Sequence, residues 1–196
     1  MLKLQNIEKS SYLGQLMWEY DMCQKDPVYF WENHYDCLHF DESINIDIDV
    51  FQNQVFDAIM SNQLTCIEGE KNTTKTTLVS SYAVWSCMFK QSHSVLYLTK
   101  SDIDRHEVMD KIVASINMMP SFLFNRLPRL TISYPQDLVF EQLNSRLQVR
   151  ESCDFNNPYL CDNTYDLLVV DDLAYYDDSF RCDNLVTNMV RKNENM

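Results

Sequence analysis

The segment of residues 66–77 constrains the fold of this chain more than any other part of it. It reads Cys-Ile-Glu-Gly-Glu-Lys-Asn-Thr-Thr-Lys-Thr-Thr. Gly69, Lys75 and Thr76 match the spacing G-x-x-x-x-G-K-[ST] of a phosphate-binding P-loop, while Thr74 occupies the position of the second glycine. Because such a loop joins a strand to the N-terminus of a helix, the segment predicts an α/β domain.

A second segment supplies the usual partner of such a loop. Four apolar residues at 167–170 lead directly into Asp171 and Asp172, which predicts a buried strand that ends in acidic side chains. In P-loop enzymes the first acid holds Mg²⁺ and the next residue, ordinarily glutamate, positions the attacking water. Asp172 is shorter than glutamate by one methylene, and a misplacement of about 1 Å costs on the order of a hundredfold in rate.

The loop also departs from a working one. Its lysine ordinarily reaches the β- and γ-phosphates and the next hydroxyl binds Mg²⁺, which assigns these roles to Lys75 and Thr76. Thr74 is β-branched, so the positive φ that glycine allows there would be costly. The alternative interpretation is a polar turn that happens to contain Lys-Thr-Thr. The strand predicted before the loop and the helix predicted after it favour the P-loop.

Composition limits the class of protein. The 196 residues suffice for about one domain with a real core. The net charge of −13, from 16 basic and 29 acidic residues, disfavours DNA binding by this chain alone. No apolar run reaches the roughly 18 residues of a membrane span, so we expect no membrane association. Seven scattered cysteines without a CxxC pair indicate reduced thiols in a cytosol, and a zinc site is not expected.

Hydrophobic periodicity predicts alternating helices and strands, and hence an α/β fold with a mainly parallel sheet. Asp26 is expected to cap a helix with Pro27 in its first turn, Asp49 a helix over 50–61, and Ser101 or Asp102 a helix to about residue 117. Residues 36–49 fit a loop or a short edge strand. Further helices are expected over 7–25, 76–90 and 183–192, and strands over 64–68, 94–99, 130–133, 138–142, 146–150 and 166–170.

Other candidate residues are less specific. Phe51 and Gln52 precede the loop strand on a predicted helix and fit a pair that stacks on adenine and reads its edge, although Phe51 in the core and Gln52 on the surface fits the spacing equally well. The four histidines lie apart in the sequence. The candidates for a nucleotide-sensing arginine are Arg126, Arg129, Arg146, Arg150 and Arg181, and position alone does not select one of them.

Six segments in order resemble the ATPase domain of the large terminase subunit of tailed phages, of the T4-like type. They are residues 26–35, the pair Phe51 and Gln52, and residues 71–77, 81–85, 119–123 and 165–175. The resemblance implies a RecA-like P-loop NTPase sheet with helices on both faces, formed by residues 50–196, with an N-terminal helical extension over 1–49 packed on it. It also implies an ATPase that uses ATP and Mg²⁺ to drive DNA into a procapsid, with the portal, the small terminase subunit and DNA as partners, in the cytoplasm of the infected bacterial host.

The resemblance also implies the roles of individual residues. Adenine binding falls to Phe51 and Gln52, the metal to Thr76 and Asp171, and catalysis to Asp172 and Lys71, which stands where the family has an arginine near the γ-phosphate. The residues implied in phosphate binding are Gly69, Thr73, Thr74, Lys75, Thr76 and Thr77.

The departures from the family decide what we expect of activity. Since Thr74 and Asp172 replace the glycine and the catalytic glutamate, we expect weakened ATP binding and hydrolysis. The chain ends before the family's coupling motif and nuclease, so we expect no nuclease activity and a possible complementing terminase chain. The alternatives are a non-catalytic pseudo-ATPase that binds or modulates a packaging motor, and a generic P-loop ATPase or helicase.

Overall fold

A mixed sheet organises the protein in this computed structural model, which describes residues 12–35, 48–62, 65–67, 75–124, 129–151 and 164–171. The five described strands follow the order β2-β3-β4-β1-β5. Their bounds are β1 Ser94–Thr99, β2 Leu130–Ser133, β3 Asp137–Phe140, β4 Ser145–Glu151 and β5 Leu167–Val170. β1 runs parallel to β4 and β5, whereas β3 is antiparallel to both β2 and β4.

The α/β class predicted from the sequence is confirmed, but the expectation of a mainly parallel sheet holds only for its centre. The segment from β2 to β4 forms an antiparallel meander. Its connections are the turn at 134–136 and the short 3₁₀ helix Glu141–Leu143 with Asn144. A parallel crossover needs a dozen or more residues, so connections of this length can join only antiparallel neighbours.

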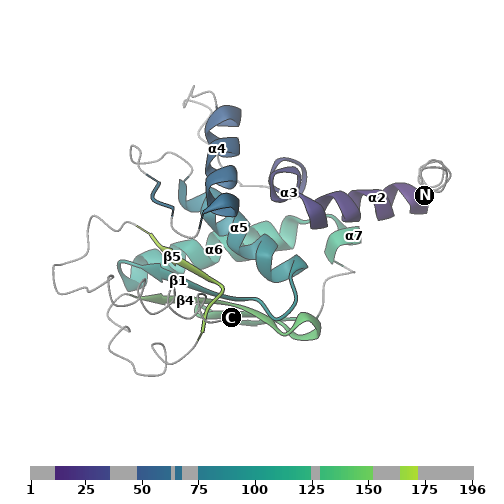
Figure 1. Ribbon diagram of the computed structural model, residues 1–196. Coiled ribbons are helices and arrows are strands. Elements are labelled where there is room, and N and C mark those ends of the chain that lie inside the picture. The colour runs from purple at the N-terminus through teal and green to yellow at the C-terminus, as the bar shows by residue number, and fades with distance from the viewer. Residues whose placement is uncertain are drawn as a thin grey trace.

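The described helices that contact the centre of the sheet lie on one of its faces. Figure 1 shows α5 (Lys75–Phe89) and α6 (Asp102–Met118) across this face. Side chains alternate along β1, so Val95 and Tyr97 join the main core beneath these helices, while Leu96 and Leu98 join a smaller cluster with Tyr165 on the opposite face. Within the described residues, helices on both faces are therefore not observed.

α5 is the central helix of the core. Every residue from 80 to 88 is buried, as expected for a helix enclosed on all sides. It packs on the sheet and on α6, and it contacts α3 (Pro27–His34) and α4 (Ile48–Ser61).

The N-terminal helices share the same core. Cys23 of α2 (Tyr12–Lys25), together with Phe30 and Trp31 of α3, belongs to the cluster that contains the α5 side chains. Tyr12, in the first turn of α2, is 77% exposed, because α2 extends beyond the helices that it packs on (Figure 1).

Several local predictions are confirmed. The Asp26 carboxylate accepts a hydrogen bond from the Val28 N–H at 2.8 Å, with Pro27 in the first turn of α3. Ser101, rather than Asp102, is the N-cap of α6. α6 ends at Met118, next to the predicted end at about residue 117, and the short helix α7 (Ser121–Phe124), which was not predicted, follows. The described cysteines Cys23, Cys66 and Cys87 are free thiols.

Two local predictions are wrong, and others are not tested. α4 begins at Ile48, so Asp49 lies in its first turn instead of capping it; aspartate is favourable at both places, so the pattern does not separate them. Residues 65–67 are not in a strand, because strand propensity does not decide whether a chain reaches a sheet edge. The Thr65 hydroxyl instead donates to the Ala58 carbonyl at 3.0 Å. Segments 36–47 and 183–192 lie outside the described residues. Within the described residues, no helix is long and apolar enough to cross a membrane.

Candidate nucleotide site

The carboxylate of Asp171 joins two distant segments of the chain. Its Oδ2 accepts a hydrogen bond from the Thr76 hydroxyl at 2.9 Å, across 95 positions in the sequence. The same oxygen accepts a second hydrogen bond from the Tyr97 hydroxyl at 2.8 Å. The start of α5, the middle of β1 and the end of β5 therefore converge on one carboxylate.

The sheet places Asp171. Its backbone N–H donates to the Leu98 carbonyl at 3.0 Å, which continues the parallel pairing of β5 with β1. Asp171 follows the last residue of β5, and its side chain is partly exposed. Ligands of open α/β sheets bind outside the carboxyl ends of the strands, and Asp171 lies at that edge.

Tyr97 lies within the core. It is 0% exposed, and burial together with the charge of Asp171 raises the pKa of its phenol well above the usual value. The phenol consequently stays protonated at neutral pH, and its O–H donates a hydrogen bond to the carboxylate.

The N-termini of α5 and α6 differ in charge. α5 begins with Lys75, Thr76 and Thr77 and has no acidic residue in its first turn. The positive end of its helix dipole therefore favours an anion.

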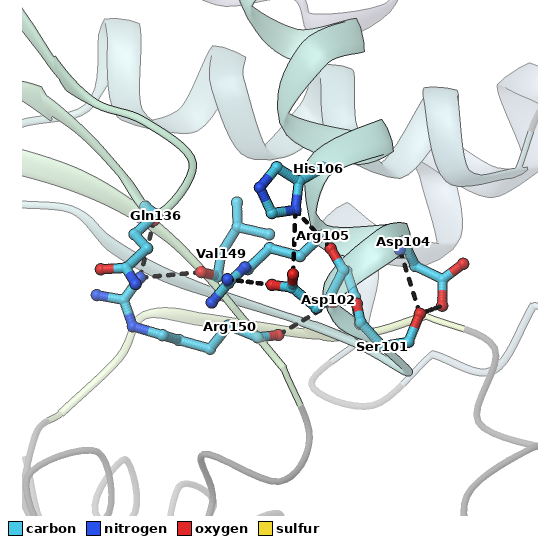
Figure 2. A network of polar contacts seen from close by, with 9 residues as sticks. Ser101, Asp102, Asp104, Arg105, His106, Gln136, Val149 and Arg150 are labelled. Atoms are coloured by element: carbon cyan, nitrogen blue, oxygen red, sulfur yellow. Dashed lines mark hydrogen bonds and ion pairs between the residues drawn. The ribbon is translucent and has the colours of Figure 1, made fainter.

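The start of α6 is occupied by its own acids, as Figure 2 shows. The Ser101 hydroxyl accepts from the Asp104 N–H at 3.3 Å and donates to the Asp104 carboxylate at 2.6 Å. The Asp102 carboxylate pairs with Arg105. These carboxylates belong to the first turn of α6 and repel an incoming anion, whereas the acid at the start of α5, Asp171, follows β5 and can share a cation with a phosphate.

The structure describes some of the site residues proposed from the sequence and not others. Lys75, Thr76, Thr77 and Asp171 are described, and the hydrogen bond of Thr76 brings the helix start to the acidic strand end. The strand predicted over 64–68, which would lead into Lys75, is not formed by the described residues 65–67, so only Asp171 follows a strand there. The predicted residues Gly69, Lys71, Thr73, Thr74 and Asp172 lie outside the described part of the chain, as do the side chains of Phe51 and Gln52, which lie on α4.

Two arginines near the sheet have structural partners. Arg150 donates to the carbonyls of Gln136 and Val149, each at 2.9 Å, and to the Asp137 carboxylate at 2.7 Å. The bond to Gln136 ties β4 to the turn before β3 (Figure 2), and the bond to Asp137 ties it to the first residue of β3. The Nε atom of Arg129 lies 3.7 Å from the Oε2 atom of Glu141, with which it forms an ion pair. Both contacts favour the structural interpretation of these side chains over a nucleotide-sensing one.

Thr76 and Asp171 fit a magnesium ion by their chemistry. Mg²⁺ prefers hard oxygen ligands and is usually held by one or two protein groups together with phosphate oxygens and water. A hydroxyl and a carboxylate oxygen 2.9 Å apart are such a pair. The described residues contain no group of three or more His, Cys, Asp or Glu side chains suited to a metal, so an ion held by Thr76 and Asp171 would complete its coordination with water or phosphate oxygens.

Sequence reasoning missed Tyr97. The segment 94–99 was recognised as a buried strand, and a tyrosine among its aliphatic residues was the available signal, since a buried phenol ordinarily has a hydrogen-bond partner. The sequence does not reveal which partner.

A comparison of the chain with models of protein families finds no match.

Proposed function

We propose that this chain is a terminase large-subunit-like ATPase domain that binds Mg²⁺-ATP at the start of α5, with weakened hydrolysis. The observation that supports it best is the 2.9 Å hydrogen bond between Thr76 and Asp171. Thr76 and Asp171 were identified from two separate sequence motifs, and their side chains are in contact at the carboxyl edge of the sheet.

The residues of the site have separate tasks in this proposal. Lys75 neutralises phosphate charge where the dipole of α5 also favours anions. Thr76 and Asp171 hold Mg²⁺, which when bound neutralises charge on the phosphates. Phe51 and Gln52 contact adenine, while Lys71 and Asp172 act on the γ-phosphate and the attacking water.

The terminase assignment adds partners. In a packaging motor the chain would work with the portal, the small terminase subunit and DNA in the cytoplasm of an infected bacterial host. A complementing terminase chain would supply the nuclease and the remaining motor parts.

A non-catalytic role is the second candidate function. Thr74 and Asp172 replace the residues that a working loop and a catalytic strand end ordinarily carry, and the net charge of −13 disfavours contact with DNA. In this alternative the chain is a pseudo-ATPase that modulates a packaging motor by binding one of its proteins.

Calorimetry with Mg²⁺-ATP tests nucleotide binding. We expect saturable binding that is lost in Lys75→Ala and weakened in Thr76→Val. The matched control is Lys111→Ala, because Lys111 is an exposed lysine of α6, and this variant should bind as the unmodified chain does. Absence of binding by the unmodified chain would refute the proposed function and favour the pseudo-ATPase. Equal binding by all variants would place the nucleotide elsewhere.

A further inference from the structure

We propose that Tyr97 is a positioning residue that holds the Asp171 carboxylate in the orientation a divalent cation needs. This inference rests on the proposed function, since it concerns the metal of the same site. Its starting point is that one oxygen of Asp171 accepts both the Thr76 and the Tyr97 hydroxyls.

The two donors to this oxygen have different surroundings. Thr76 lies in the first turn of α5 and is partly exposed, so its hydroxyl can rotate and offer a lone pair to a cation. Tyr97 is fully buried on β1, in the same core cluster as the α5 side chains. Its ring is held by this packing, and its hydroxyl therefore stays directed at the carboxylate.

Such an anchor affects metal affinity through orientation. A carboxylate that is already held in place has less conformational freedom to lose when it binds a cation. Groups that hydrogen-bond to metal ligands typically change metal affinity by about 10–100-fold when they are mutated. Removal of the Tyr97 hydroxyl should have an effect of this size, while the aromatic ring that fills the core remains.

The same sheet offers a matched control. The Tyr165 hydroxyl donates to the Gln148 side chain at 3.2 Å, and both residues are 6% exposed. Tyr165 belongs to the small cluster on the opposite face of the sheet. Tyr165→Phe therefore removes one buried phenolic hydroxyl without touching Asp171, as Tyr97→Phe removes one that does.

The experiment uses Mn²⁺ alone as the probe, with the free ion measured by electron paramagnetic resonance in the presence of the full chain at high concentration. We expect the unmodified chain to bind Mn²⁺ and Asp171→Asn to lose it. Tyr97→Phe should bind about 10–100-fold more weakly, and Tyr165→Phe should bind as the unmodified chain does. Thermal unfolding of both phenylalanine variants checks that their folds are comparably stable.

The outcomes separate the two proposals. Equal Mn²⁺ affinity in Tyr97→Phe and the unmodified chain, an equal loss in the two phenylalanine variants, or no Mn²⁺ binding at all would overturn the role of Tyr97. Mn²⁺ binding with the expected pattern but without ATP binding would overturn the proposed function and leave the metal-positioning role standing. ATP binding that does not depend on divalent cations would overturn the role of Tyr97 in metal binding and leave nucleotide binding by the chain standing.

Discussion

Trp85→Phe should destabilise the protein by removing a hydrogen bond between α5 and α2. The Trp85 indole N–H donates to the Cys23 carbonyl at 2.7 Å, and the two residues are 7% and 0% exposed. Cys23 lies in the last turn of α2, where carbonyls lack intrahelical partners. Four residues on, Pro27 has no N–H to donate. The indole therefore satisfies a carbonyl that the backbone leaves open.

The magnitude follows from these two facts. A buried carbonyl without a partner costs about 1–3 kcal/mol, and the smaller phenyl ring leaves a cavity that costs on the order of 1 kcal/mol more. The free energy of unfolding should therefore fall by about 2–4 kcal/mol. With an m-value of about 2 kcal/mol per molar urea, the unfolding midpoint should drop by about 1–2 M.

Urea unfolding followed by far-UV circular dichroism measures this change without relying on tryptophan fluorescence. Tyr12→Phe is the control, because Tyr12 is 77% exposed and its loss should change stability by less than about 0.5 kcal/mol. A decrease below about 0.5 kcal/mol for Trp85→Phe would refute the argument that the indole is the partner this carbonyl needs.

Three further predictions concern pH, catalysis and DNA. Burial raises the pKa of the Cys87 thiol to about 12 from its usual 9.0. The unfolded chain consequently loses this proton at lower pH than the folded chain, and stability should fall between these values by up to about 1.4 kcal/mol per pH unit for this group. Urea midpoints measured at about pH 8, 9 and 10, which bracket the ordinary pKa of a thiol, should decline less steeply with pH in Cys87→Ala than in the unmodified chain. Parallel declines would show that the Cys87 thiol is not the cause. Thr74→Gly combined with Asp172→Glu should raise ATP hydrolysis, measured by phosphate release against each single variant; no gain would show that these two replacements do not limit activity. The free chain should bind duplex DNA weakly at physiological salt in fluorescence anisotropy, because its net charge is −13, and tight binding would refute the charge argument.

The sequence alone determined the local structure where neighbouring residues supply the energy. Asp26 and Pro27 begin α3 because a capping carboxylate and a fixed φ act within one turn. The apolar run at 94–99 forms β1, and the P-loop spacing identified the residues that open α5. The metal-binding roles that we propose for Thr76 and Asp171 come from their sequence motifs.

Only the tertiary structure decided which distant groups meet. The bond between Thr76 and Asp171 and the bond between Tyr97 and Asp171 depend on the pairing of β5 with β1 and on the packing of α5 over that sheet. Short connections turned three predicted strands into an antiparallel meander, and residues 65–67 have strand propensity without being in a strand. Strand pairing and side-chain partners arise from contacts between segments far apart in the chain, and local propensity carries no information about those contacts.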